Sequence, residues 1–211
     1  MPRKKQWKNL VFEGGGVRCI GYAGALKVLE KRGVLHSIER VAGTSSGAIT
    51  AALVAVGYTA EELLELLDSV DFRQFKDSSW GVIRNVARLI SGYGWYKGDS
   101  FKVWMQDCIK AKTGTEHTTF SDLANSVEFK NLYVVGTNLS IKSTEVFSYE
   151  TSPNMEIVDA IRVSMSIPLF FRSVRLKNTL YVDGVVLKNY PINIFDNTEY
   201  IHCATIVTGK L

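Results

Sequence analysis

The stretch that decides the fold is VAGTSSGAIT, residues 41–50. A short apolar run enters a Gly-x-Ser-x-Gly pattern that begins at Gly43, is centred on Ser45 and ends at Gly47. A nucleophile elbow needs a strand before its serine, a helix after it and small residues around the strained turn. This stretch meets those needs, so Ser45 is a candidate nucleophile. The alternative is that Ser45 or Ser46 is an ordinary helix N-cap.

A second glycine-rich loop precedes this corner, at Gly14, Gly15 and Gly16. Backbone N–H groups at the start of a helix attract anions. The nucleotide-binding glycine motifs do not fit, because Cys19 and Tyr22 stand where those motifs need a glycine and a lysine. The N–H groups of Gly15 and Gly16 are instead candidates for an oxyanion hole. A tight turn between a strand and a helix is the alternative.

Predicted strands and helices alternate along the chain. We expect strands at 8–12, 40–43, 132–138, 145–149, 174–176, 180–182 and 201–207, and helices at 17–32, 48–56, 59–70, 99–112 and 152–164. The strands at 174–176 and 180–182 are expected to form a hairpin. The helix at 59–70 begins with a capping box of Thr59 and Glu62, and Ser152 and Pro153 are the expected N-cap and first residue of the last helix. This alternation predicts an α/β fold with a mostly parallel sheet covered on both faces. In such sheets, sites gather at the carboxyl ends of the strands, where both glycine-rich corners lie.

Length and composition indicate a single domain. The 211 residues are 46% hydrophobic, which is enough to bury a core. Residues 71–98 interrupt the alternation and are predicted to form an insertion or cap. The three cysteines lack the spacing of a disulfide framework or a zinc site. The sequence shows no signal peptide and no apolar run of about 20 residues. We therefore expect a soluble, cytoplasmic protein.

The positive charge is concentrated in two segments. The formal net charge is +4, and residues 1–8 and 71–112 are basic and hold all four tryptophans. Residues 80–91 have the pattern of a basic amphipathic helix, which can lie among lipid headgroups. One hypothesis is therefore that residues 72–104 form a cap that docks on membranes, and the alternative is a helix packed on the core. Nucleic acid is not expected, because the net charge is small and no nucleic-acid-binding motif is present.

A serine nucleophile needs a base, and two candidates occur late in the chain. The order Ser45, Asp183, His202 matches that of an α/β-hydrolase triad, but His202 lies inside a predicted strand, which favours a structural role. Asp183 precedes Gly184, and Asp-Gly is also a strong hairpin signal. For Asp183 to act directly as the base, burial must raise its pKa from about 3.9.

These motifs together resemble the patatin-like phospholipases. That family has a glycine-rich loop followed by a basic residue, a Gly-x-Ser-x-Gly elbow and a late Asp-Gly, which correspond here to residues 14–18, 43–47 and 183–184. The runs GWYKGDSF, TFSDL and AIRVSMSIPLFF, at residues 94–101, 119–123 and 160–171, are also similar to the family. The resemblance covers about residues 9–196.

The resemblance implies a three-layer α/β/α fold and a Ser-Asp dyad without a catalytic histidine. It makes Ser45 the nucleophile and Asp183 its base, and it makes an oxyanion hole of Gly14, Gly15, Gly16, Val17 and Arg18. The implied reaction is hydrolysis of phospholipids or other acyl-ester lipids at a membrane surface, through an acyl-enzyme and without a metal or cofactor. Acyl transfer, a non-catalytic lipid-binding module and a histidine-dependent hydrolase are the alternatives. A protein activator is compatible with the sequence, although no residue indicates one.

Three features depart from the family pattern. In the glycine loop, Cys19 stands where a further glycine is usual and Glu13 where aspartate is common. Val185 replaces a second glycine after Asp183-Gly184. The chain also ends soon after the strand expected at 201–207. We therefore expect a C-terminal cap or an acyl-pocket wall to be absent or to come from a partner.

Overall fold

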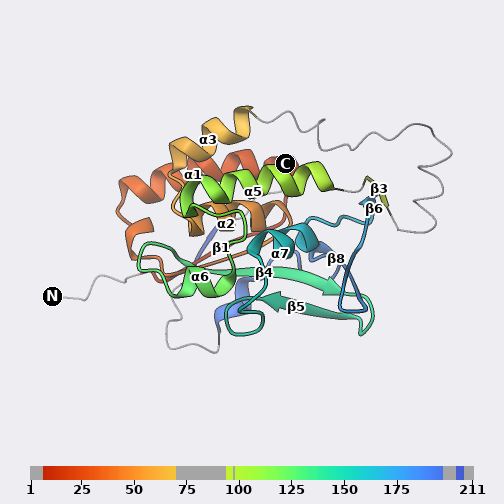
Figure 1. Ribbon diagram of the computed structural model, residues 1–211. Helices are drawn as coiled ribbons and strands as arrows, with labels where there is room; N and C mark the ends of the chain where they lie inside the picture. The colour runs from red at the N-terminus through yellow and green to blue at the C-terminus, as the bar shows by residue number, and fades with distance from the viewer. Residues whose placement is uncertain (1–6, 70–93, 97, 197–202, 207–211) are drawn as a thin grey trace.

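The structure is a computed structural model that describes residues 7–69, 94–96, 98–196 and 203–206 (Figure 1). Its centre is a seven-stranded sheet with the order β7-β8-β4-β2-β1-β9, in which β5 also pairs with β4. These strands are β1 Asn9–Phe12, β2 Arg40–Thr44, β4 Asn131–Asn138, β5 Ser143–Phe147, β7 Val174–Leu176, β8 Thr179–Asp183 and β9 Cys203–Ile206. Two short strands, β3 Gly94–Tyr96 and β6 Leu169–Phe171, pair separately. Most of the predicted cap at 71–98, the helix at 80–91 and His202 lie outside the described residues.

The sheet is mixed. Strands β9, β1, β2 and β4 run parallel, as the alternation of strands and helices predicts. Strands β5 and β8 are antiparallel to β4, and β7 is antiparallel to β8. The predicted hairpin between β7 and β8 is confirmed. Its two-residue loop places Lys177 and Asn178 at positive φ, +45° and +65°, which suits the twist of a tight hairpin.

Helices follow the parallel strands and cover one face of the sheet (Figure 1). The α-helices are α1 Ile20–Lys31, α2 Ser46–Ala55, α3 Ala60–Ser69, α5 Asp99–Thr113, α6 Phe120–Ala124, α7 Ile157–Ser164 and α8 Val185–Lys188, and the short 3-10 helices are η1 Gly16–Cys19, η2 Leu35–Ser37 and η4 Ile192–Phe195. Helix α3 begins as predicted, because the Thr59 N–H donates to Glu62 Oε2 at 2.8 Å and the Glu62 N–H donates to Thr59 Oγ1 at 3.2 Å.

The start of α7 differs from the expectation. Ser152 and Pro153 were predicted to begin this helix, but it starts at Ile157. Ser152 instead belongs to a turn in which its N–H donates to the Ser148 carbonyl at 2.8 Å. Glu156, the residue before the helix, forms an antiparallel bridge with Thr119. Long-range pairing therefore overrides the local N-cap and proline signal.

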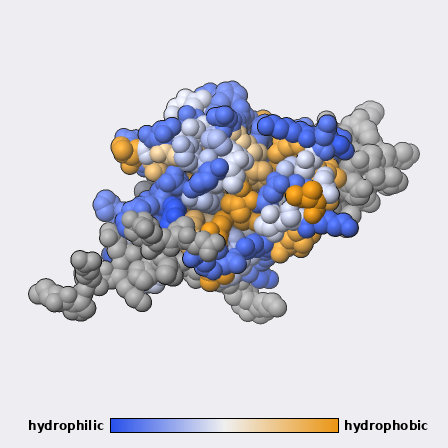
Figure 2. Space-filling model, turned by 90° about the horizontal axis from the view of Figure 1, so that it is seen from below, coloured by the Kyte–Doolittle hydropathy of each residue, from blue (hydrophilic) through white to orange (hydrophobic). Residues whose placement is uncertain are grey.

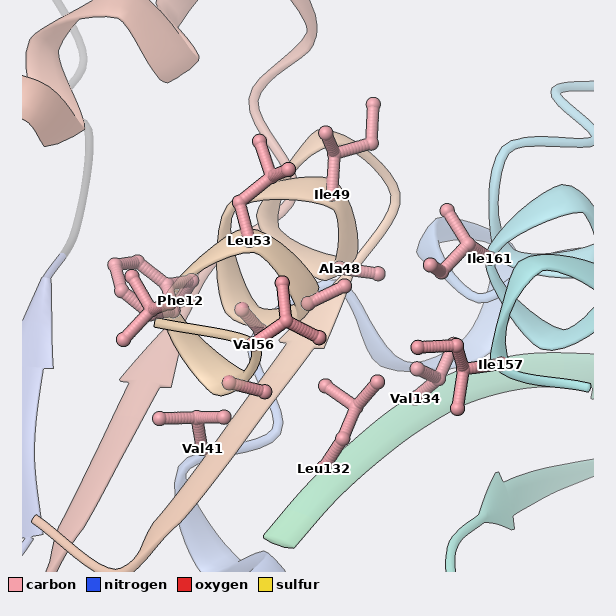
Figure 3. Close-up of a cluster of buried hydrophobic side chains, with 14 of the residues drawn as sticks. Phe12, Val41, Ala48, Ile49, Leu53, Val56, Leu132, Val134, Ile157 and Ile161 are labelled. Atoms are coloured by element: carbon pink, nitrogen blue, oxygen red, sulfur yellow. The ribbon is translucent and has the colours of Figure 1, made fainter. Parts of the chain in front are cut away.

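Helix α2 forms the centre of the main core. All of its ten residues are buried, because the helix is enclosed by the sheet below it and by other helices. Figure 3 shows Ala48 and Val56 among the side chains of Phe12, Val41 and Leu132 from three neighbouring strands. A helix that is apolar all round is typical of such an enclosed position. This packing fixes the start of α2, directly after Ser45, against the sheet.

A smaller cluster covers the other face of the sheet. Val11 and Ala42 pack there against Phe195 of η4. The Phe195 ring meets Tyr133 edge-on, with centroids 4.9 Å apart. The α/β fold is therefore confirmed, and a thin segment supplies the layer on this face. Seen from below, the surface carries apolar side chains between hydrophilic ones (Figure 2). Within the described residues, no helix is both long and apolar enough to cross a bilayer.

Candidate active site

Two strands run toward each other along the same edge of β4. Thr44, the last residue of β2, is opposite Val135, and Asp183, the last residue of β8, is opposite Gly136. Strand β5 occupies the other edge at the same two positions. Because β2 is parallel to β4 and β8 is antiparallel to it, their carboxyl ends meet. Ser45 and Asp183 are thus brought together although 138 positions separate them in the chain.

The two side chains form a direct, buried hydrogen bond. Ser45 Oγ donates to Asp183 Oδ2 at 2.7 Å. Ser45 is 2% exposed and Asp183 is fully buried. The other carboxylate oxygen, Oδ1, accepts from the Val185 N–H at 2.8 Å, which fixes the orientation of the carboxylate. The predicted pair therefore lies in contact.

Ser45 occupies the strained corner that the elbow pattern predicts. Its φ of +54° and ψ of −128° lie in a region that residues with a side chain rarely adopt. The glycines on either side allow close contact between backbones. A Cβ on Gly43 would lie 2.2 Å from the Gly47 carbonyl oxygen, and one on Gly47 would lie 2.4 Å from the Glu13 carbonyl oxygen. Both flanking positions therefore require glycine.

Burial tunes the carboxylate of Asp183. Loss of solvent raises its pKa from 3.8 to about 6, although the Val185 N–H and the Ser45 hydroxyl oppose this by hydrogen bonding to the charged form. A carboxylate with this pKa is ionised at neutral pH and accepts a proton more readily than an exposed one. Burial thus raises the pKa of Asp183, as the sequence required of a base at this position.

The glycine loop lies against the start of α2. The Gly15 N–H donates to Ser46 Oγ at 3.0 Å, and the Gly14 N–H donates to the Asn189 carbonyl at 3.1 Å. Gly16 and Val17 begin η1, so their N–H groups have no acceptor inside that helix. Gly16 has a φ of +57°, which explains the need for glycine there. Arg18 follows on the surface.

Comparison with known proteins identifies the family of the chain. The sequence model of the patatin-like phospholipase family matches residues 10–196. The chain belongs to that family. It is 37% identical to YqhO of Bacillus subtilis over 88% of this chain and 65% of that protein. It is 30% identical to "Probable lipid hydrolase 463L" of Invertebrate iridescent virus 6 over 91% of this chain and 64% of the viral protein. The chain thus spans about two thirds of these relatives.

The fold is also that of a solved crystal structure. VipD from Legionella pneumophila superposes with a TM-score of 0.71, over 95% of this chain and 49% of VipD. The two sequences are 22% identical, so this likeness shows a shared fold. In this patatin-like chain, the region that the family model matches includes both the elbow and Asp183.

The turn that ends α7 was not predicted to take part in the site, yet it contacts both members of the pair. Ser164 Oγ accepts from the Ser45 N–H at 2.8 Å, and Met165 Sδ lies 3.7 Å from Ser45 Oγ. The Ser166 carbonyl accepts from the Asp183 N–H at 3.0 Å. The only signal was the family-like run at 160–171, which contains these residues.

An apolar cavity opens beside the pair. Its volume is about 170 Å³, and Met165 and Ser46 place it next to Ser45. Its lining residues are Gly16, Val17, Cys19, Ser46, Ile49, Leu67, Phe101, Trp104, Met165, Ile167, Phe170 and Phe171. A second cavity among the described residues, with a volume of about 670 Å³, is lined by Glu145, Glu156 and Tyr181 among others and does not include the pair.

Two of the three histidines fall in the described part of the chain, and neither approaches Ser45. His36 lies in η2, before β2 begins, so it is at the opposite end of that strand from Ser45. His117 is exposed, and its Nδ1 lies 2.9 Å from Glu156 Oε1. Among the residues that the structure describes, no group of three His, Cys, Asp or Glu side chains could hold a metal ion.

Proposed function

We propose that this protein is a lipid acyl hydrolase with Ser45 as the nucleophile and Asp183 as its base. The observation that carries the proposal is the 2.7 Å hydrogen bond from Ser45 Oγ to Asp183 Oδ2 at a strained elbow. Asp183 takes the hydroxyl proton while Ser45 Oγ attacks the ester carbonyl, and it gives this proton to the alcohol oxygen as the ester C–O bond breaks and the alcohol leaves. The restored carboxylate then takes a proton from water, which attacks the acyl-enzyme, and this proton returns to Ser45 Oγ as the fatty acid is released.

The negative charge on the attacked oxygen needs hydrogen-bond donors. The N–H groups of Gly16 and Val17 are the proposed donors in the glycine loop, since those of Gly14 and Gly15 already donate within the protein. The Ser46 N–H, at the start of α2, lies next to the nucleophile and is the elbow's own donor. Each donor of this kind is worth about 2.7 to 4 kcal/mol of transition-state stabilisation.

The apolar cavity supports an acyl chain as the part of the substrate next to Ser45. Aromatic and aliphatic side chains dominate its lining, so it offers few partners to a polar group. Its volume of about 170 Å³ is below the roughly 300 to 1,000 Å³ of pockets that enclose a drug-sized ligand. We therefore propose that one acyl chain enters the cavity and that the headgroup stays outside it.

A substrate of this kind is reached at a lipid surface, so we propose peripheral membrane binding by an otherwise cytoplasmic protein. Apolar side chains at the cavity rim support it, because Val17 is 68% exposed, Phe170 40% and Ile167 36%. Arg18 adds positive charge beside them. We further propose that residues 1–211 form one catalytic domain with residues 71–98 as its cap.

The test is acyl release from mixed phospholipid vesicles by the wild type and by Ser45→Ala, with the products identified by mass. We expect fatty acid release by the wild type and none above background by Ser45→Ala. Both proteins must show the same thermal unfolding, so that lost activity cannot be attributed to misfolding. Release that persists in Ser45→Ala would contradict the proposed nucleophile. A folded wild type that releases nothing and does not react with a fluorophosphonate would contradict the proposed hydrolase.

A further inference from the structure

We infer that Ser164 is a positioning residue for Ser45 and that the turn ending α7 sets the separation between Ser45 and Asp183. This inference rests on the proposed function, because it concerns the placement of the proposed nucleophile. It begins from the point where β2 and β8 meet. Neither strand pairs with the other there, so their relative placement depends on groups outside the two strands.

Ser164 links the elbow to β4 at this point. Its hydroxyl accepts from the Ser45 N–H at 2.8 Å and donates to the Val135 carbonyl at 2.6 Å. Val135 is opposite Thr44, the last residue of β2, so the hydroxyl lies where the β2–β4 ladder stops. Ser164 is fully buried, and water does not compete for these partners. One hydroxyl thus ties the nucleophile's backbone to the central strand.

The same turn holds Asp183. The Ser166 carbonyl accepts from the Asp183 N–H at 3.0 Å. The Ser166 hydroxyl donates to the Arg162 carbonyl and accepts from Arg162 Nη1, each at 2.7 Å, which connects this residue firmly to α7. Two residues of one turn therefore hold the backbones of both members of the pair. A rigid turn of this kind fixes the distance between Ser45 Oγ and the carboxylate.

The elbow needs such a tie because its conformation is unfavourable. Ser45 has a φ of +54°, and a strained residue persists only when its surroundings impose the conformation. Without the Ser164 hydroxyl, the Ser45 N–H and the Val135 carbonyl would both lose their partner in a buried place. A change in the backbone conformation of Ser45 would then give these groups new partners, and it would move Ser45 Oγ away from its place beside Asp183. A shift of about 1 Å at a reacting group can lower the rate about 10²-fold.

The decisive comparison uses a soluble p-nitrophenyl ester and a fluorophosphonate probe on the full chain. For Ser164→Ala we expect kcat and the labelling rate to fall about 10- to 100-fold while KM stays within about threefold, since the lost interaction places the nucleophile and does not bind substrate. Ser37→Ala is the matched control. Its hydroxyl also joins two backbone segments, donating to the Trp7 and Val34 carbonyls at 2.8 and 2.9 Å, but it precedes β2. We expect wild-type kinetics from it.

A second pair of variants distinguishes the effect of the Ser164 hydroxyl from the effect of side-chain packing at that position. Threonine and valine have nearly the same shape, and only threonine keeps the hydroxyl. Ser164→Thr should retain much more activity than Ser164→Val, and this pair decides the question if Ser164→Ala does not fold. Wild-type rates in Ser164→Ala, or equal rates in the Thr and Val variants, would overturn the inference.

A crystal structure of Ser164→Ala gives a readout that does not depend on activity. We expect Ser45 to leave its positive φ, or its Oγ to leave hydrogen-bond distance of Asp183. If both are retained, the inference is wrong even where the wild type proves to be an esterase. If the wild type is inert but the elbow relaxes in the variant, the proposed function fails and the positioning role stands.

Discussion

Asp183 is a residue whose chemistry opposes its own burial. Its carboxylate is fully buried, and desolvation raises its pKa to about 6. The sequence made Asp183 and Ser45 candidates and required burial of the aspartate. It left base and hairpin turn open, because Asp-Gly has the same local signature in both. In the structure helix α8 follows directly after β8, so Asp183 does not begin a hairpin turn, and its contact with Ser45 supports the proposed base.

The first prediction concerns the stability of Asp183→Asn. The raised pKa of Asp183 means that the folded state disfavours the charged carboxylate. The neutral carboxyl therefore contributes its full stability below the unfolded pKa of 3.8. This contribution is lost as the pH rises through the folded pKa of about 6. A difference of about two pKa units corresponds to about 3 kcal/mol. At pH 7.5, Asp183→Asn should therefore be inactive yet more stable than the wild type by about 1 to 3 kcal/mol.

Thermal unfolding at several pH values checks this prediction. The gain should appear at pH 7.5 as a rise in Tm of roughly 2 to 4 °C per kcal/mol. It should shrink toward pH 4, where the wild-type carboxyl is itself neutral. A variant that is less stable than the wild type at every pH would show that the carboxylate contributes more through its hydrogen bonds than it costs by burial.

The second prediction concerns the pH dependence of the reaction. As the proposed base, Asp183 must be ionised to accept the Ser45 proton, so kcat/KM should fall on the acid side with a midpoint at about pH 6. The profile should be measured with an uncharged soluble ester, so that the lipid surface does not titrate. A midpoint near pH 4, the value for an exposed aspartate, would argue against Asp183 as the base.

At the scale of elements, the elbow depends on contacts that leave no room for a side chain. The third prediction compares two glycine-to-alanine changes. Gly43→Ala places a Cβ 2.2 Å from the Gly47 carbonyl oxygen, so it should lower the free energy of unfolding by more than about 3 kcal/mol and abolish activity. Gly24→Ala adds a Cβ with no atom within 4 Å on the exposed side of α1, and should raise that free energy by about 0.5 to 1 kcal/mol.

Chemical denaturation of both variants measures these differences. If Gly43→Ala is as stable and as active as Gly24→Ala, the elbow is not constrained by the backbone contacts described above. If Gly43→Ala lowers the free energy of unfolding and Gly24→Ala raises it, the constraint lies at the elbow.

The elements were predictable where the signal is local. The capping box of α3 and the β7–β8 hairpin were predicted from neighbouring residues and are confirmed, because both depend on hydrogen bonds within a few positions. The predicted start of α7 was wrong, because it depends on the bridge between Thr119 and Glu156, which are far apart in the chain. The role of Ser164 was also hidden, because its partners Ser45 and Val135 come from other elements.

At the scale of the whole molecule, the apolar cavity is assembled from several distant segments. Leu67 of α3, Phe101 of α5 and Phe171 of β6 line it together with the elbow. No pattern within one segment predicts such a cavity, because its walls meet only in the folded chain. Its size and shape become properties of the tertiary structure alone.

The fourth prediction uses a substitution that narrows this cavity. Leu67→Trp should lower kcat/KM for decanoyl esters by about tenfold or more and leave acetyl esters nearly unchanged, because only the longer chain needs the filled space. Leu64→Trp is the control, since Leu64 lies on the same helix, is 45% exposed and does not line the cavity. A profile of p-nitrophenyl esters of increasing length makes the measurement. Equal loss for all lengths in Leu67→Trp would place the acyl chain elsewhere.

The meeting of β2 and β8 on one edge of β4 also has a consequence for biosynthesis. During translation the elbow leaves the ribosome long before β8 is made, and any nascent chain that ends before residue 183 holds a serine without its partner. Non-local pairing of this kind forms late in folding. The proposed esterase activity therefore requires the closed sheet, and an unfinished chain that lacks Asp183 should be inactive.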